Sequence, residues 1–136
     1  MGSPAKQAAA GRSEAQWAKG YFEPQNPAER TKRDQDGLDV HDRIVATHAR
    51  EGFGSISQQD LRVRYRWYGL YTQRPEEDGF FMMRIRVPGG LLTAEQVEAV
   101  GRISQRYGRD VCDVTDRQNF QLHWIQVEDV PEIWAG

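Results

Sequence analysis

The stretch TDRQNFQLHW, residues 115–124, combines side chains that could bind an anion. Counted with the two-residue period of a strand, Phe120, Leu122 and Trp124 fall on one side. The other side carries a hydroxyl, a guanidinium, two amides and an imidazole, which belong to Thr115, Arg117, Asn119, Gln121 and His123. These groups can donate hydrogen bonds to an oxyanion. This side is therefore either a surface that faces a ligand or a solvated strand face.

Two earlier stretches add arginine to the same pattern. A strand is predicted over residues 80–87, with Arg84 and Arg86 on the face opposite its apolar residues. Residues 61–71 alternate in the same way and bring three more arginines to one face, Arg62, Arg64 and Arg66. Arginine suits the planar, two-point recognition of carboxylate or phosphate. Since Asp116 is out of phase and the face holds almost no carboxylate, the sequence predicts an anion-binding face, with a basic solvated face as the alternative.

The elements around these strands indicate a sheet with a helix on one face. Thr93 and Gln96 form a capping box, and apolar residues then recur at helical spacing as far as Gly108, so a helix is predicted over residues 94–107. Its single apolar stripe can cover only one face of a sheet. Residues 111–115 and 119–127 predict further strand, which we interpret as one long bent strand. The order β-β-α-β favours an α+β fold.

Residues 13–57 predict a helical N-terminal arm, which follows a short tail. Residues 1–12 are small and polar and are expected to be disordered, and residues 13–19 predict a short helix. A second helix begins at Asn26 and Pro27 and ends before Asp36. A third is expected over residues 38–50, and its inward stripe comprises Leu38, Ile44, Val45 and His48. The domain that follows is expected to run from residue 58 to residue 136.

Composition and charge argue against several classes of protein. The net charge of −2 argues against a protein that acts mainly on nucleic acid. No apolar run approaches the roughly 18–20 residues of a membrane span, and the N-terminus lacks the apolar core of a secretory signal. The single cysteine, Cys112, excludes an internal disulfide, so the expected location is the cytoplasm. His41 and His48 lack a third ligand, and no metal site is expected.

The last residues predict the beginning of another amphipathic element. Val130, Ile133 and Trp134 are its candidate inward residues. A helix of one or two turns gains little stability by itself. We therefore expect that the sequence is cut just after this element begins, and that the domain is truncated at its C-terminal end.

Three strings in the chain resemble one known family. They are LRVRYRWYGLYTQR from residue 61, FFMMRIRVPGGLLTAEQ from residue 80 and DVTDRQNFQLHWIQVEDVPEIW from residue 113. Together they are similar to the N-terminal part of the ferredoxin-dependent sulfite and nitrite reductases, and the helical arm from about Ser13 onward looks like the same family's N-terminal segment. These enzymes carry sirohaem coupled to a [4Fe–4S] cluster.

The resemblance implies a ferredoxin-like half-domain, present twice in a complete enzyme. It also implies reduction of sulfite to sulfide or of nitrite to ammonia, with electrons from reduced ferredoxin. Arg84 matches a family residue that faces the substrate anion and would be catalytic. Sirohaem is held in the family through its carboxylates, and the positions that match its contacts here are Thr115, Arg117, Asn119, Gln121 and His123, joined by Arg86 and Tyr71.

The chain departs from the family pattern in its cysteines. The family's cluster ligands are cysteine pairs in the C-terminal half, and Cys112 does not match one of them. The second half-domain and further basic pocket residues are also missing. We therefore expect a fragment that needs the remainder of the reductase and is inactive alone. Two alternatives are a free-standing ferredoxin-like module that binds an anionic ligand or a partner protein through its arginine-rich face, and a non-functional truncated product.

Overall fold

The computed structural model describes residues 27–136, and the chain divides into two compact units, residues 1–34 and residues 35–136. In the first unit the described element is α3 (Pro27–Asp34), which confirms the predicted helix and its end before Asp36. The Thr31 hydroxyl donates to the carbonyl of Pro27 at 2.9 Å. The predicted disordered tail, the helix over residues 13–19 and the cap at Asn26 lie outside the described residues.

The second unit begins with a helix in three parts, α4 (Asp39–Arg43), η1 (Ile44–His48) and α5 (Ala49–Glu51). The middle part, η1, is a π-helical turn, a feature that is frequent at functional sites. Because the three parts together run from Asp39 to Glu51, the helix expected over residues 38–50 is confirmed. Leu38 was expected to face inward but is 78% exposed, whereas Ile44 and His48 are buried.

The first predicted strand is wrong over most of its length. Residues 58–68 form two short helices, α6 (Gln58–Arg62) and the 3-10 helix η3 (Arg64–Tyr68), and only β1 (Leu70–Thr72) is a strand. The Ser57 hydroxyl accepts from the backbone N–H of Asp60 at 3.1 Å and caps α6. Leu61 and Tyr65 are both buried and stand four residues apart, a spacing that fits a helix as well as a strand.

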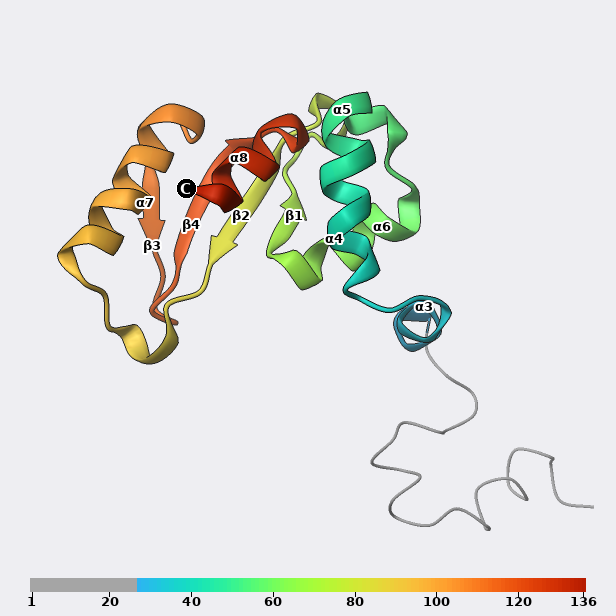
Figure 1. The fold of residues 1–136 in the computed structure, drawn as a ribbon, viewed down its shortest axis with the longest axis horizontal. Coiled ribbons are helices and arrows are strands. Elements are labelled where there is room, and N and C mark those ends of the chain that lie inside the picture. The colour runs from blue at the N-terminus through green and yellow to red at the C-terminus, as the bar shows by residue number, and fades with distance from the viewer. Residues whose placement is uncertain (1–26) are drawn as a thin grey trace, which may run out of the picture. The chain divides into compact units, whose positions relative to one another are not determined.

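The sheet has four antiparallel strands in the order β1-β2-β4-β3. Besides β1 they are β2 (Phe81–Ile85), β3 (Cys112–Val114) and β4 (Phe120–Ile125), and Figure 1 shows them lying across the middle of this unit. Because β3 and β4 pair with each other, the prediction of one long bent strand is wrong. The chain reverses between them, with the backbone N–H of Thr115 donating to the carbonyl of Asn119 at 2.9 Å.

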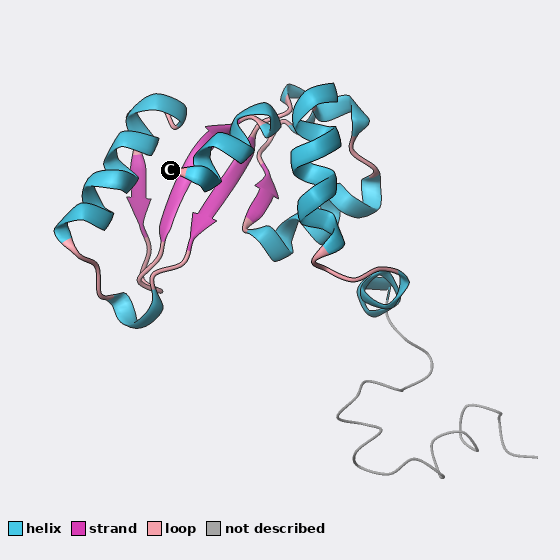
Figure 2. Ribbon diagram, in the orientation of Figure 1, coloured by secondary structure: helices cyan, strands magenta, loops and turns pink. Residues whose placement is uncertain are grey.

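Two further helices complete the unit, α7 (Ala94–Tyr107) and α8 (Val130–Ala135). The predicted capping box is present, because Thr93 and Gln96 exchange side-chain-to-backbone hydrogen bonds of 2.9 and 3.2 Å. The remaining elements are short 3-10 turns, namely η2 (Phe53–Ser55), η4 (Glu76–Asp78), η5 (Pro88–Gly90) and η6 (Val127–Asp129). Figure 2 shows helices packed around a single sheet, so the predicted α+β class is confirmed.

The core lies between one face of the sheet and the helices. Phe81, Met83, Leu122 and Ile125 point into it from β2 and β4, and all are at most 3% exposed. The helices contribute Val40, Ile44, Leu61, Tyr65, Val130 and Ile133. Within residues 27–136 no helix is long and apolar enough to cross a membrane.

A β-bulge in β4 changes the expected alternation. Leu122 pairs with Met83 and Ile125 pairs with Phe81, so His123 and Trp124 together stand opposite the single residue Met82. The bulged residue, Trp124, has φ of 60°. A bulge re-aims the side chains that follow it, and Ile125 takes the buried position that periodicity assigned to Trp124.

Candidate functional site: the polar face of the sheet

The sheet face opposite the core carries most of the hydrogen-bonding side chains of the strands. Its members are fixed by pairing, since Tyr71 stands opposite Met82 and Arg84 stands opposite Gln121. Residues two apart on a strand share a face, which places Met82 with Arg84 and Gln121 with His123. We call Tyr71, Met82, Arg84, Gln121 and His123 the polar face. Each of them is half-buried.

Arg84 is the cation of this face that is held most firmly. Its guanidinium carbon lies 5.2 Å from the centre of the Tyr71 ring, within the range of a cation–π interaction. Its Nε is buried and makes no hydrogen bond to any of residues 27–136. A buried, unpaired donor of this kind costs free energy unless a partner arrives. The Arg84 side chain therefore has the properties expected of a group that awaits an anionic acceptor.

The backbone beside Arg84 is fixed by Gly69. The N–H of Arg84 donates to the Gly69 carbonyl at 2.8 Å. Gly69 has φ of 74°, and a Cβ at this position would stand 2.6 Å from the Arg84 carbonyl oxygen. Glycine is therefore required here both by the left-handed backbone and by the close approach of β2.

One carboxylate does lie on this side of the sheet. Asp113 on β3 pairs with Gln121, and its Oδ2 is 3.1 Å from Nε2 of His123. One long bent strand over residues 111–127 would not bring residue 113 beside residue 121, so the sequence did not predict this neighbour. This contact orients the His123 imidazole, while Asp113 itself remains 58% exposed at its side chain.

The polar run TDRQNFQLH does not form one continuous face. Of its polar side chains only Gln121 and His123 belong to β4, because residues 115–119 make the turn between β3 and β4. The Thr115 hydroxyl accepts from the N–H of Asn119 at 3.3 Å, and the Asn119 Oδ1 accepts from the N–H of Val87 at 3.3 Å. These two side chains thus shape the turn and tie it to the end of β2.

Two cations flank this connection. Arg117 is exposed within the β3–β4 turn, and Arg86 is exposed one residue beyond the end of β2. The contact between Asn119 and Val87 joins the turn to the segment after β2. Gly90, in the segment after β2, also lies close to the β3–β4 turn, because a Cβ added to Gly90 would be 2.6 Å from Oε1 of Gln118. The two loops that carry Arg86 and Arg117 are therefore positioned as one assembly.

The three arginines that the sequence placed together have three different environments. Arg62 is exposed and pairs with Glu76 at 3.7 Å. Arg64 is buried and pairs with Asp60 at 3.0 Å. Arg66 is exposed, and its guanidinium carbon lies 5.9 Å from the centre of the Tyr71 ring. Of the three, only Arg66 reaches the polar face, so the prediction that all three share one face is wrong for Arg62 and Arg64.

A buried polar cluster lies behind η3, around Asp60. The Asp60 carboxylate accepts hydrogen bonds of 2.9 and 2.8 Å from Arg43 and one of 3.0 Å from Arg64. Burial alone would raise the pKa of Asp60, but these hydrogen bonds outweigh burial and hold its pKa below the ordinary value. Asp60 is therefore ionised at neutral pH, and it links α4 and α6 to the start of η3.

His48 and Tyr65 extend this cluster without adding a charge. Burial lowers the pKa of His48, although the charge of Asp60 offsets part of the effect. Burial also raises the pKa of the Tyr65 hydroxyl, which lies 2.6 Å from Nδ1 of His48. Tyr65 therefore keeps its proton and can donate to a neutral imidazole. Both residues are buried and serve the packing of the unit.

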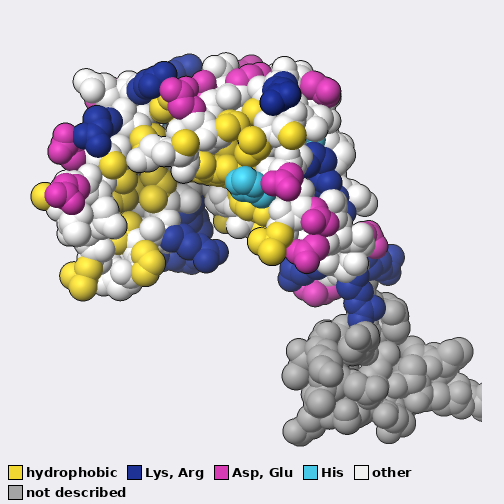
Figure 3. All heavy atoms as spheres, viewed as in Figure 1, with side chains coloured by type: hydrophobic (Ala, Val, Ile, Leu, Met, Phe, Trp, Pro, Cys, Tyr) yellow, Lys and Arg dark blue, Asp and Glu magenta, His cyan; other side chains and the backbone are white. Residues whose placement is uncertain are grey.

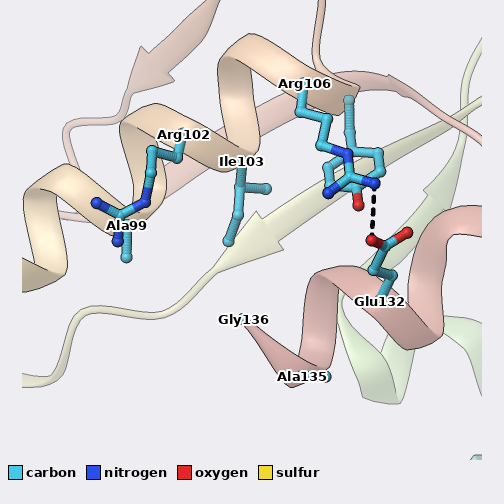
Figure 4. A pocket seen from close by; sticks show the side chains of 8 residues that line it. Ala99, Arg102, Ile103, Arg106, Glu132, Ala135 and Gly136 are labelled. Atoms are coloured by element: carbon cyan, nitrogen blue, oxygen red, sulfur yellow. Dashed lines mark ion pairs between the residues drawn. The ribbon is translucent and has the colours of Figure 1, made fainter.

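An apolar groove lies on the other face of the sheet, between α7 and α8. Met83, Ile103, Ile133 and Trp134 are among the residues that line it, and Figure 3 shows hydrophobic side chains gathered in the hollow beside α7. A second pocket between these helices is spanned by an ion pair of 2.8 Å between Arg106 and Glu132, drawn in Figure 4. Tyr68 and Arg84 also line the apolar groove, and Arg102 and Tyr107 line the second pocket.

Metal ligands are not grouped in the described part of the chain. Within residues 27–136 no cluster of three His, Cys, Asp or Glu side chains could hold a metal ion. His41 is exposed and stacks on Trp134 with ring centres 5.3 Å apart, while His48 is buried against Tyr65. Cys112 is half-buried, and burial raises the pKa of its thiol.

Comparison with known proteins relates part of this chain to a described protein family. Residues 73–136, which include β2, α7, β3 and β4, match the nitrite/sulfite reductase ferredoxin-like half domain. The match is confined to this part of the chain, which is similar to that half domain. The resemblance noted in the sequence and the expected ferredoxin-like half-domain are therefore confirmed.

The relatives of the half domain are reductases. The chain is 46% identical over 138 residues to the sulfite reductase [ferredoxin] of Mycobacterium tuberculosis, which covers 90% of this chain and 25% of the relative. It is 38% identical over 118 residues to the chloroplastic ferredoxin–nitrite reductase of Spinacia oleracea, with coverage of 82% and 20%.

A solved structure agrees with this assignment. The NirA protein of Mycobacterium tuberculosis superposes with a TM-score of 0.77 at 45% identity, over 91% of this chain and 26% of that one. The chain thus spans about a quarter of the length of the sulfite reductase it matches. The predicted boundary of the domain at residue 58 stays a prediction.

Proposed function

We propose that the polar face is this chain's contribution to the substrate and cofactor site of a ferredoxin-dependent sulfite or nitrite reductase. The observation that carries the proposal is Arg84, whose guanidinium lies against Tyr71 and whose buried Nε has no partner within residues 27–136. Gln121 stands directly opposite it, and His123 follows on the same strand. This arrangement is what a site for anions requires, because fixed donors need little reorganisation when the ligand arrives.

The donor set fits sirohaem, a tetrapyrrole with many carboxylates. Guanidinium, amide and imidazole groups all donate hydrogen bonds to carboxylates. Gln121 would hold the ring's carboxylates from the sheet, and Arg86 and Arg117 would do so from the adjoining loops. His123 would join them through Nδ1 as an imidazolium, because its Nε2 faces Asp113. Thr115 and Asn119 would act through the shape of the turn, because their side chains already bond to backbone groups of residues 27–136.

Arg84 is proposed to act on the substrate anion. A guanidinium keeps its proton at all accessible pH values, so Arg84 can offset the charge of sulfite or nitrite and donate hydrogen bonds to its oxygens. These bonds strengthen as oxygen leaves and charge builds up on it, which is electrostatic stabilisation of the transition state. When bound, the sirohaem would supply the electrons that reduce the anion. Tyr71 keeps the guanidinium in place through its ring.

The remaining parts of the reaction are proposed to come from the rest of the enzyme. A [4Fe–4S] cluster is held by several cysteine thiolates, and the sequence contains one cysteine. We therefore propose that residues outside this sequence would hold such a cluster, which would supply electrons received from reduced ferredoxin, and that the 136 residues alone do not turn over substrate. The expected cytoplasmic location stays a prediction.

The proposal can be tested in a chimaera in which this chain replaces the matching segment of the Mycobacterium tuberculosis sulfite reductase. Arg84→Gln should retain sirohaem absorbance and lower kcat/KM for the anion on the order of a hundredfold, the loss typical of removing one such donor. The matched control is Arg102→Gln, because Arg102 is an exposed arginine of α7 paired with Glu98.

The cofactor role has its own readout in the same chimaera. His123→Ala should lower sirohaem occupancy, measured by absorbance against protein concentration, because it removes a donor to the ring's carboxylates. Wild-type turnover in Arg84→Gln would remove the assigned role of Arg84. Full occupancy in His123→Ala combined with Arg117→Ala would mean that the polar face is only solvated.

A further inference from the structure

Arg66 stands beside the polar face although it does not belong to the sheet. It is an exposed residue of η3, and it shares the ring of Tyr71 with Arg84, the guanidinium carbons lying 5.9 and 5.2 Å from the ring centre. Within residues 27–136 neither guanidinium forms an ion pair. Like charges held near one ring repel each other, and a bound anion would offset that repulsion.

The helix η3 that carries Arg66 is fixed at both ends. At its start, Arg64 is buried and donates to Asp60 at 3.0 Å. At its end, Gly69 accepts from the N–H of Arg84 at 2.8 Å. The backbone of Arg66 is therefore held in register with that of Arg84. A cation on such a backbone loses less conformational entropy on binding than one on a free loop.

The neighbouring arginines show that this placement is particular to Arg66. Arg62 and Arg64 lie on the same short segment, and each has a carboxylate partner, Glu76 and Asp60 respectively. Packing and pairing thus account for both of them. Arg66 has no such partner within residues 27–136, so its position against Tyr71 is not explained by an ion pair of the fold.

We propose that Arg66 is a second anion-binding residue of the polar face, which takes another carboxylate of the polycarboxylate ligand that Arg84 faces. This inference rests on the proposed function of the polar face. The pair of arginines favours a rigid ligand that carries several separated carboxylates. Such a ligand can reach both cations, which lie at different points around Tyr71.

The test uses the 136-residue chain and uroporphyrin, an iron-free porphyrin rich in carboxylates. Its affinity is measured by fluorescence anisotropy at low ionic strength, where exposed charges are least screened. Arg66→Gln should weaken binding about tenfold, the effect of losing one charge-assisted hydrogen bond. Arg62→Gln is the matched control and should bind as the wild type does, since Arg62 is engaged with Glu76.

A second readout separates binding from a structural role. Without ligand, Arg66→Gln should resist urea as well as the wild type or better, because the repulsion with Arg84 is relieved. Arg66→Lys should keep part of the affinity, because it retains the charge and loses the planar fork. A stabilising structural residue would instead lower the urea midpoint in both variants.

The possible results distinguish this inference from the proposed function. If Arg84→Gln weakens uroporphyrin binding while Arg66→Gln does not, Arg66 has no part in the site and the proposed function stands. If Arg62→Gln weakens binding as much as Arg66→Gln, the effect is one of net charge and the inference fails. If the wild type does not bind, or binds equally well without Arg84, both are overturned.

Discussion

Replacement of Asp60 by alanine should strongly destabilise the unit formed by residues 35–136. Asp60 is 3% exposed and accepts hydrogen bonds from Arg43 and Arg64. Arg64 is itself 7% exposed, so the substitution leaves a buried cation without its carboxylate. Removing one partner of a buried pair costs about 3–5 kcal/mol. Since domains of this size are stable by only about 5–15 kcal/mol, the variant should lie near the limit of folding.

The measurement is urea unfolding followed by circular dichroism, with Asp60→Asn and Asp42→Ala beside Asp60→Ala. Asp60→Asn keeps an acceptor and should lose less. Asp42 also contacts a basic side chain, His41, but its carboxylate is 90% exposed. A surface pair contributes about 0–1 kcal/mol, so Asp42→Ala should be nearly neutral. A loss below about 1 kcal/mol in Asp60→Ala would show that Arg64 is solvated in solution, and would refute the reasoning.

The same carboxylate should make stability depend on pH with a defined sign. The hydrogen bonds from Arg43 and Arg64 hold the pKa of Asp60 below 3.8, its ordinary value, against the opposite effect of burial. A group with a lowered pKa in the folded state stabilises the protein above its unfolded pKa and loses that contribution as pH falls through the folded pKa. The difference between wild type and Asp60→Asn should therefore be full at neutral pH and shrink below about pH 4.

Two further predictions concern how the site is supported. In Gly69→Ala the new Cβ would lie 2.6 Å from the Arg84 carbonyl oxygen. The substitution should therefore lower the free energy of unfolding by more than the roughly 1–2 kcal/mol of a left-handed alanine, and it should lower turnover of the chimaera. The control Gly54→Ala should be neutral, because a Cβ at Gly54 meets nothing within 4 Å. Asn119→Ala removes the acceptor of the Val87 N–H and should cost about 1 kcal/mol in urea unfolding while uroporphyrin affinity falls little. Unchanged stability with a large loss of affinity would instead make Asn119 a direct ligand contact.

Local signals in the sequence were sufficient for part of the fold. The capping box of Thr93 and Gln96 and the helical spacing behind it defined α7 from its first residue to its last. The strand β2 followed from its alternation and from the Pro88 turn that stops it. Each of these elements is specified by residues within one or two turns of each other, so no tertiary contact was needed to predict it.

The segment before β1 could not be predicted in this way because its pattern suits two structures. Leu61 and Tyr65 are four apart, and so are Asp60 and Arg64, so the same residues that alternate as a strand also align on a helix. The choice is made by the Ser57 cap and by burial of Asp60 between Arg43 and Arg64. Arg43 lies 17 residues before Asp60, beyond the reach of any local rule.

The site residue that could be predicted most directly is Arg84, because its prediction does not depend on which strands pair. Arg84 follows from the alternation of β2 alone, and its place opposite the core is independent of its neighbours. The polar run over residues 115–124 is interrupted twice. A turn without glycine, with Gln118 at φ of 60°, interrupts it first, and a bulge at Trp124, also at φ of 60°, interrupts it again. Non-glycine residues seldom adopt this backbone, so the sequence carried no signal for either feature.

These two irregularities account for the composition of the polar face. The turn sends β3 back along β4 and brings Asp113 to His123, while the bulge keeps His123 on the face and moves Trp124 away from the core. Arg66 reaches the same face from a 3-10 helix, by way of Tyr71. The cations and amides of the site thus come from separate elements that the sheet brings together. Arg84 and Arg66 share the ring of Tyr71, whereas Asn119 accepts from Val87, so a substitution at Asn119 leaves the ring contacts of both arginines in place.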